Sequence, residues 1–247
     1  MDFAAKNQPA PWNLRAVAET GSTNTDLMEA GAEGAPDRTV LRADHQTAGR
    51  GRLDRTWEAP AGRNLLVSFL FRDVPDDPHA LTQAVSLAAR EVARGAGVEA
   101  DIKWPNDLLV GTAKLGGLLA QAGPVVDGAP SFVVIGLGLN IGAAPEGAAS
   151  LVSAGCTHEI SPQGFLESML PLIDGFLALD PDDLHATYRA SLATIGARVA
   201  VELPSGEKIT GRALDVSRDG RLLVLDDCAV THRLDTADVV HLRPADS

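Results

Sequence analysis

Three arginines stand close together in the segment QTAGRGRLDRTW, residues 46–57. Arg50 and Arg52 alternate with Gly49 and Gly51, and Arg55 follows shortly before Trp57. A guanidinium group offers paired N–H donors that match phosphate or carboxylate oxygens, and glycine lets the backbone approach a ligand closely. The segment is therefore either an anion-binding loop or a basic turn in water, and its composition fits both.

This segment matches neither of the common glycine-rich nucleotide loops. It has no GxxxxGK[ST] run and no GxGxxG run that opens a helix. The chain as a whole is acidic, with 21 Lys and Arg against 33 Asp and Glu and a formal net charge of −12. A broad nucleic-acid surface needs many cations. We therefore expect phosphate chemistry to use this local cluster, and we expect no DNA partner.

A further cation opens KWPNDL, residues 103–108. Pro105 favours an extended conformation at Trp104, so the side chains of Lys103 and Trp104 should point to opposite sides. A lysine at the end of a strand can act as a fixed positive charge for a carboxylate or phosphoryl oxygen. It can equally be an edge-strand lysine whose amine reaches water over an apolar neighbour.

Glycines leave one face of a predicted strand without side chains. In GLGLN, residues 136–140, Gly136, Gly138 and Asn140 share one face because successive residues of a strand alternate. Two glycines at this spacing indicate close approach by a ligand or by another backbone. Packing of a helix on the strand needs the same space, so both explanations stay open.

Two other segments have similar character. Gly116 and Gly117 fall in KLGGLLAQ, residues 114–121, and leave two positions of a second predicted strand without side chains. The run Ser22-Thr23-Asn24 stands at the start of a predicted helix, where small polar residues usually act as caps. The same three side chains could instead converge on a neutral ligand rich in carbonyl and N–H groups.

Hydrophobic periodicity predicts the elements that must position these segments. Strands are expected at residues 14–20, 39–44, 63–72, 100–105, 107–111, 114–121 and 131–141. Helices are expected at residues 22–34, at 79–95, around Phe165–Phe176, and from Asp180-Pro181 through Leu184, Tyr188 and Ile195. The strand at 63–72 is apolar on both faces and should therefore be central in its sheet.

After Gly196 the pattern changes to five short strands separated by turns, at 197–204, 208–217, 221–227, 230–235 and 239–244. These predict a small all-β barrel. The earlier strands come in hairpin-like pairs rather than in regular β-α-β alternation, which favours an α+β fold with a mixed or antiparallel sheet. We therefore expect two domains, residues 1–195 and 196–247.

Composition also limits the cellular setting. The N-terminal MDFAAKNQPAPWN has no basic region followed by a long apolar run, so we expect no secretory signal. No stretch reaches the roughly 18 consecutive apolar residues that a membrane span needs. Cys156 and Cys228 make no metal motif, and we expect reduced, buried thiols in a cytoplasmic protein with no membrane partner.

Taken in order, these segments resemble the biotin protein ligases, the biotin–[acetyl-CoA-carboxylase] ligases. The matched motifs are Ser-Thr-Asn at 22–24, Gln-x-x-Gly-Arg-Gly-Arg-x-x-Arg-x-Trp at 46–57, Lys-Trp-Pro-Asn-Asp at 103–107, Lys-Leu-Gly-Gly at 114–117 and Gly-Leu-Gly-Leu-Asn at 136–140. The resemblance covers essentially the whole chain. It implies a fold related to the class II aminoacyl-tRNA synthetases, followed by a C-terminal SH3-like barrel.

The resemblance also implies a two-step reaction. Biotin and MgATP give biotinyl-5′-AMP and pyrophosphate, and a lysine of a biotin carboxyl carrier domain then takes the biotinyl group. The implied catalytic residues are Lys103, Arg50 and Arg52. The implied biotin-binding residues are Ser22, Thr23, Asn24, Gln46, Arg50, Gly51, Arg52, Lys103, Gly116 and Gly117. The implied ATP-binding and AMP-binding residues are Arg52, Arg55, Trp57 and Asn140.

Metal ligands are not assigned by the motifs; Asp107 is a candidate only by its proximity to Lys103. We expect the glycine-arginine segment to be mobile when empty and to order over the adenylate, where it would exclude water. About twenty residues precede Ser22, too few for the DNA-binding domain of some family members. The competing hypotheses are a lipoate–protein ligase, whose Arg-Arg-x-x-Gly-Gly-Gly pattern is absent, and a sensor of biotin without catalysis.

Overall fold

The computed structural model describes residues 11–53, 55–203, 205–235 and 241–244. The N-terminal residues 1–10 lie outside this part of the chain, as do Val239 and Val240 at the start of the last predicted strand. The sheets, the helices and most of the predicted motifs lie within it.

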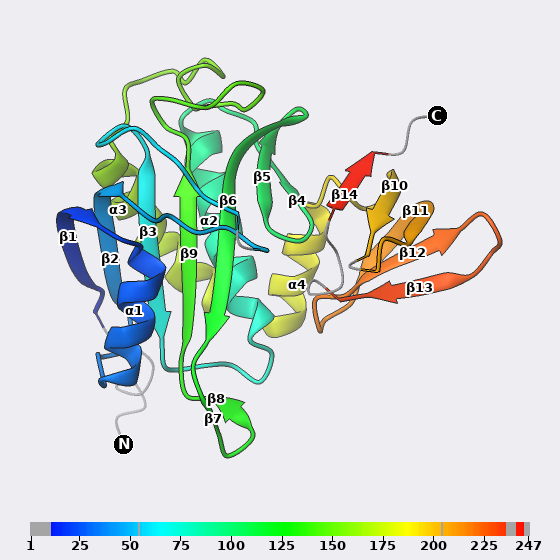
Figure 1. Cartoon of the computed structure of the whole chain (residues 1–247), viewed down its shortest axis with the longest axis horizontal. Coiled ribbons are helices and arrows are strands. Elements are labelled where there is room, and N and C mark those ends of the chain that lie inside the picture. Colours follow the sequence, from blue (N-terminus) through cyan, green and yellow to red (C-terminus); the bar gives the residue numbers. More distant parts are fainter. Residues whose placement is uncertain (1–10, 54, 204, 236–240, 245–247) are drawn as a thin grey trace, which may run out of the picture.

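A seven-stranded mixed sheet forms the centre of the molecule (Figure 1). Its strands are β1 (Asn13–Thr20), β2 (Thr39–Gln46), β3 (Leu65–Phe71), β4 (Asp101–Lys103), β5 (Asp107–Val110), β6 (Ala113–Ala122) and β9 (Val133–Leu139). They lie in the order β1-β2-β3-β9-β6-β5-β4. β1 and β2 are parallel, and the other neighbouring strands are antiparallel. The predicted α+β class with a mixed sheet is confirmed.

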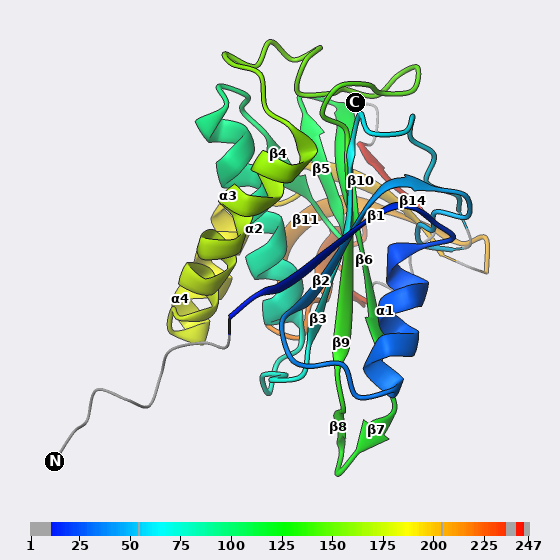
Figure 2. The same cartoon turned by 90° about the vertical axis from the view of Figure 1, so that its left-hand side faces the viewer.

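Helices cover both faces of this sheet (Figure 2). α1 (Thr23–Ala32) lies on one face, whereas α2 (His79–Gly95), α3 (Pro162–Leu177) and α4 (Pro181–Ala190) lie on the other. Because both faces are covered, every residue of β3 is buried, which confirms its predicted central position. The parallel pairing of β1 with β2 follows from the crossover through α1.

Two predicted helix details were wrong. α4 ends at Ala190, so Ile195 lies in the turn that follows it rather than on the helix. Ser22 occupies the N-cap position of α1, but its side chain makes no capping hydrogen bond. Ser22 is buried and lines the cavity described below.

The C-terminal residues form a five-stranded antiparallel sheet in the order β13-β12-β11-β10-β14. Its strands are β10 (Arg198–Glu202), β11 (Lys208–Val216), β12 (Leu222–Asp226), β13 (Thr231–Leu234) and β14 (His241–Pro244). A separate small hairpin, β7 (Val125–Val126) and β8 (Ala129–Pro130), extends from the end of β6. One buried apolar cluster includes Val85 of α2, Trp104 and Val224 of β12, so the C-terminal sheet shares a core with the rest of the molecule.

The cysteines are free, but the expectation of burial was wrong. Cys156 is half-buried and Cys228 is exposed. Within the described residues, no helix combines the length and the apolar character that crossing a membrane requires.

Candidate functional site

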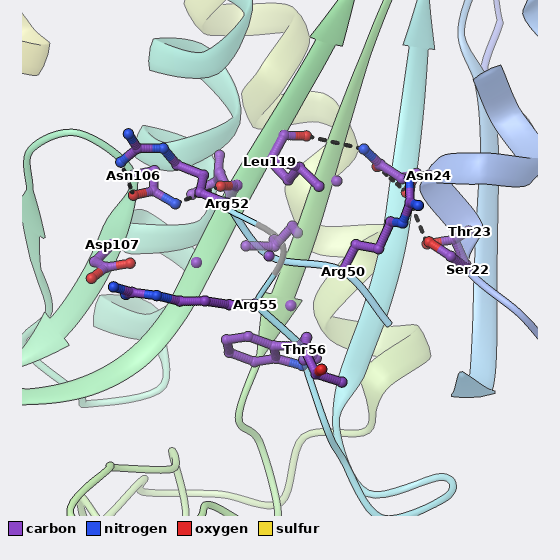
Figure 3. A pocket seen from close by; sticks show the side chains of 18 of the residues that line it. Ser22, Thr23, Asn24, Arg50, Arg52, Arg55, Thr56, Asn106, Asp107 and Leu119 are labelled. Atoms are coloured by element: carbon purple, nitrogen blue, oxygen red, sulfur yellow. Dashed lines mark hydrogen bonds between the residues drawn. The ribbon is translucent and has the colours of Figure 1, made fainter. Parts of the chain in front are cut away.

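A cavity of about 270 Å³ lies between the central sheet and the arginine loop, by which we mean residues 49–53 and 55–57 (Figure 3). The predicted site residues that line it are Ser22, Thr23, Asn24, Gln46, Arg50, Gly51, Arg52, Arg55, Trp57, Lys103 and Gly117. They come from the start of α1, the end of β2, the loop itself, β4 and β6. The fold therefore brings distant segments together; Asn24, for example, bonds to Leu119 of β6, 95 residues further along the chain.

One end of the cavity carries neutral hydrogen-bonding groups. The backbone N–H and the hydroxyl of Thr23 donate to Oε1 of Gln46, over 2.7 and 2.9 Å. The Thr23 and Ser68 hydroxyl oxygens are 2.8 Å apart, and Ser68 Oγ donates to Asn24 Oδ1 over 2.7 Å. Asn24 Nδ2 donates to Gln121 Oε1 over 2.8 Å. This network fixes the direction of each amide that faces the cavity.

The two hydroxyls of this network supply too few protons for their contacts. Thr23 and Ser68 carry one hydroxyl proton each, yet three contacts depend on them: Thr23 to Gln46, Thr23 to Ser68, and Ser68 to Asn24. One of these contacts lacks a hydrogen at any instant. The network therefore holds more oxygen lone pairs than hydrogens, and it can accept a hydrogen bond from an N–H donor of a bound molecule.

The glycine face of β9 is filled by protein side chains. A Cβ on Gly136 would lie 2.2 Å from Asn24 Oδ1, and a Cβ on Gly138 would lie 2.4 Å from the indole of Trp57. Gly136 therefore makes room for the start of α1, as the helix-packing explanation required. Gly138 makes room for the arginine loop. Since Asn24 and Trp57 both line the cavity, the two glycines shape it through these side chains.

Two predicted site residues do not line the cavity. Asn140 follows the last residue of β9 and is 2% exposed; its Oδ1 accepts from Asn64 Nδ2 over 3.2 Å, and its Nδ2 donates to the Ala149 carbonyl over 3.1 Å. Gly116 faces the neighbouring strand, where a Cβ would lie 2.9 Å from the Gly138 carbonyl oxygen. Both support the sheet and its following loop, and their predicted roles in ligand binding stay predictions.

The other end of the cavity is cationic. Arg52, Arg55, Lys103 and Lys114 line it, whereas Arg50, a fifth cation of the cavity, extends toward Asn24. Among the described residues, Asp107 is the only carboxylate that lines it, and Asp107 Oδ1 lies 2.6 Å from Lys114 Nζ. This excess of positive charge is suited to an anion that carries several oxygens.

Figure 3 shows how the loop divides its arginines. Arg50 extends toward Asn24, whereas Arg52 and Arg55 extend toward Asn106 and Asp107. Arg52 Nη1 donates to Asn106 Oδ1 over 3.4 Å. Burial lowers the pKa of the Arg52 guanidinium; the Asp107 carboxylate opposes that shift and the Arg55 charge adds to it. An anion placed beside these guanidiniums would relieve both the burial cost and their mutual repulsion.

Short backbone bonds close the arginine loop on itself. Gly51 N–H donates to the Arg55 carbonyl over 2.7 Å, and Trp57 N–H donates to the Gly49 carbonyl over 2.9 Å. A Cβ on Gly49 would lie only 2.3 Å from the Trp57 carbonyl oxygen, so this crossing requires glycine. The loop also contacts Lys114 of β6. Lys114 Nζ lies 5.6 Å from the centre of the Trp57 ring, which is a cation–π contact.

The family models decide what kind of protein this is. The biotin/lipoate A/B protein ligase family matches residues 17–140, and the biotin protein ligase C-terminal domain matches residues 194–242. The chain belongs to the biotin/lipoate A/B protein ligase family. It is 42% identical to the biotin–[acetyl-CoA-carboxylase] ligase of Mycobacterium tuberculosis, over 93% of this chain and 89% of that protein. These findings confirm the predicted family and the enzyme class of ligase.

Other members of the biotin/lipoate ligase family differ in length or in sequence. The chain is 30% identical to the bifunctional ligase/repressor BirA of Bacillus subtilis, over 82% of this chain but 66% of that protein. The structure of a biotin protein ligase from Aquifex aeolicus in complex with biotin and ATP matches with a TM-score of 0.77 at 24% identity, over 94% of this chain and 99% of that one. At this identity the structural likeness establishes the fold.

The predicted set of binding residues missed several polar cavity residues of this ligase, among them Ser68, Asn106, Asp107 and Lys114. Ser68 had a detectable signal, since it is a polar residue within the apolar run 65–71 of a central strand. Lys114 begins the matched Lys-Leu-Gly-Gly motif. Sequence motifs identify such residues, but they do not predict that β5 and β6 place Asp107 and Lys114 in contact.

Proposed function

We propose that this ligase activates biotin with MgATP to form biotinyl-5′-AMP and then transfers the biotinyl group to a lysine of a biotin carboxyl carrier domain. The observation that carries the proposal is a single cavity with a neutral, amide-rich end and a cationic end. Biotin has the same polarity, with a neutral ureido ring at one end and a carboxylate at the other. The relatives named as biotin ligases support this choice of substrate.

The ureido ring of biotin fits the neutral end by its hydrogen-bonding groups. Its N–H groups would donate to oxygen lone pairs of the network of Thr23, Ser68 and Asn24, which has fewer hydrogens than acceptor positions. Ser22, whose hydroxyl does not cap α1, is available as a further partner. Neutral donors and acceptors of this kind recognise a urea without the desolvation cost that a buried charge would add.

The cationic end is suited to the first chemical step. A carboxylate oxygen of biotin attacks the α-phosphorus of ATP, a P–O bond forms, and the bond to the pyrophosphate leaving group breaks. This reaction brings two anions together, so positive charges held in place before the reaction lower its barrier. We assign this role to Lys103, Arg50 and Arg52, and contacts with the AMP portion to Arg52, Arg55 and Trp57.

The second step breaks the mixed anhydride. The uncharged amine of the carrier lysine attacks the acyl carbon, AMP leaves, and the amine loses a proton as the amide forms. Water would compete for the same carbon. The arginine loop lies across the cavity, so we propose that it shields the adenylate from water until the carrier arrives.

Magnesium is best explained as part of the MgATP substrate. Among the described residues, no group of three or more His, Cys, Asp or Glu side chains could hold a metal ion. Asp107 is paired with Lys114, and Asn106 Oδ1 accepts from Arg52. The donor set here suits an ion that brings phosphate and water ligands with it, as Mg²⁺ usually does.

We also propose the finer structural relationships that the sequence suggested. The central sheet would be related to the class II aminoacyl-tRNA synthetases, and the C-terminal sheet to SH3-like barrels. The boundary between the two domains would fall near residue 196, between α4 and β10. The C-terminal family match from residue 194 is consistent with that position.

The proposed reaction is tested by one transfer assay. With biotin, MgATP and a biotin carboxyl carrier domain, we expect a carrier that streptavidin detects, and a carrier whose acceptor lysine is changed to arginine should stay unlabelled. Lipoate supplied in place of biotin should give no product. Transfer of lipoate instead would assign the protein to the other branch of its family, and binding of biotin without any product would favour a sensor.

The shielding role of the arginine loop predicts a change in protease sensitivity. Arg50 and Arg55 are exposed, and we expect trypsin to cleave after them. Biotin and ATP together should slow this cleavage about tenfold or more, because the adenylate would hold the guanidiniums in charge-assisted hydrogen bonds. Cleavage can be followed by mass spectrometry, with Arg218, which is exposed in the turn after β11, as an internal reference site. Equal rates with and without both substrates would rule out shielding.

A further inference from the structure

The strand that carries Lys103 is short and lies at the edge of the central sheet. β4 has three residues and pairs with β5 on one side. On its other side, Ile102 N–H donates to the Ser191 carbonyl over 3.1 Å, and Ala193 N–H donates to the Ile102 carbonyl over 2.9 Å. Segment 191–194 therefore acts as an additional strand partner, and Lys103 depends on residues that directly precede the C-terminal sheet.

Trp104, the neighbour of Lys103, is held by two hydrogen bonds, one from its backbone and one from its indole. Its backbone N–H donates to Thr194 Oγ1 over 2.9 Å. Its indole Nε1–H donates to the Gly220 carbonyl over 2.9 Å, and the side chain is 2% exposed. The indole bond joins the Lys-Trp-Pro-Asn-Asp motif to the turn between β11 and β12.

That turn, residues 217–221, is the Gly220 turn, and it is firmly seated on the helices. Gly220 has φ +76°, and a Cβ there would lie 2.6 Å from the ring of His79 at the start of α2. His185 of α4 bonds to the Val216 carbonyl over 3.1 Å, and Arg189 forms a two-point ion pair with Asp215. The turn can thus serve as a fixed support for the Trp104 indole.

We propose that the C-terminal sheet positions Lys103 for adenylate formation, through the Gly220 carbonyl and the Trp104 indole. This inference rests on the proposed function. Trp104, Thr194 and Gly220 are positioning residues: they set the place of the Lys103 amine relative to the cavity. The neutral end of the cavity comes from α1, β2, β3 and β6, so displacement of the Gly220 turn should leave biotin binding intact.

The test compares two glycine-to-alanine variants at positions with similar positive φ angles, +76° at Gly220 and +83° at Gly206. Gly220→Ala forces the turn away from His79, whereas Gly206→Ala, at φ +83° with no atom within 4 Å of its Cβ, introduces the strain alone. Misplacement of a catalytic group by about 1 Å can cost up to 10²-fold in rate. For Gly220→Ala we expect a fall of about tenfold in single-turnover adenylate formation per biotin-binding site, with unchanged biotin Kd. Gly206→Ala should stay within about twofold of the unaltered chain.

Rates are expressed per biotin-binding site, counted by calorimetric titration, because partial unfolding would lower the number of sites but not the rate at each. Removing the obstructing ring should restore the rate, so Gly220→Ala with His79→Ala should resemble Gly206→Ala. Trp104→Phe, which keeps the ring but loses the N–H, should also slow adenylate formation.

Two results would overturn the inference: an unaltered rate per site in Gly220→Ala, or an equal fall in Gly206→Ala. The failure of the proposed function is distinguishable from either, because the unaltered chain would then form no biotinyl-adenylate at all.

Discussion

Replacing Lys103 with alanine is expected to lower the rate of biotinyl-adenylate formation by about 10²–10³-fold, the loss typical for a preorganised group that stabilises transition-state charge. Lys103 ends β4 and lines the cationic end of the cavity. The residues that hold this strand in the core are its neighbours Ile102 and Trp104, which are 1% and 2% exposed. Removing the amine should therefore leave the free energy of unfolding nearly unchanged.

The measurement pairs pyrophosphate release with a thermal unfolding curve. Lys208→Ala is the matched control, because Lys208 is an exposed lysine on β11 that does not line the cavity. That control should change neither quantity. A fall in activity of Lys103→Ala that merely follows a fall in thermal stability would support the alternative of an edge-strand lysine without a catalytic role.

Gly136→Ala is expected to weaken biotin binding by about 100-fold, because displacement of Asn24 would break or strain several hydrogen bonds at about 1 kcal/mol each. The added methyl group would lie 2.2 Å from Asn24 Oδ1 and 3.4 Å from Ser68 Oγ. Asn24 cannot keep its bonds to both Ser68 and Gln121 if it moves away. The ureido end of the proposed site would then lose its fixed geometry.

Calorimetric titration with biotin measures this loss, and Gly175→Ala is the matched control. Gly175 lies in α3 with no atom within 4 Å of its Cβ position, so alanine there should keep biotin affinity and stabilise the helix by up to about 1 kcal/mol. In the double variant Gly136→Ala with Asn24→Ala, the methyl group has space. The two changes should therefore be strongly non-additive. Biotin affinity that is unaffected by Gly136→Ala would refute the assigned role of Asn24.

Local patterns were sufficient to predict most elements of this chain. The two-sided apolar run 63–72 determined a central strand, and the helical spacing within 79–95 determined α2. The order of the motifs was enough to identify the family, because those residue types are needed at those spacings whatever their exact surroundings. These features depend on neighbours within a few residues, which a sequence displays directly.

Asn140 and Gly116 show where this reasoning stops. Alternation along 136–140 placed Asn140 on the same face as the two glycines, but β9 ends at Leu139 and Asn64, 76 residues away, takes the amide into a buried network. The vacancy at Gly136 was predicted, whereas its occupant, Asn24, was not. Alternation gives the direction of a side chain only while the strand continues, and it never names the partner.

The sequence by itself determined which residues are available for chemistry: a set of neutral polar residues, a set of cationic residues, and the helices and strands that carry them. Only the tertiary structure decided which members meet. It paired Asp107 with Lys114, joined Thr23 to Ser68, and brought Trp104 to Gly220, 116 residues further along the chain. Such contacts depend on the order of the strands and on how helices pack against a turn that is distant in sequence. Both are determined by burial of the whole core rather than by any local pattern.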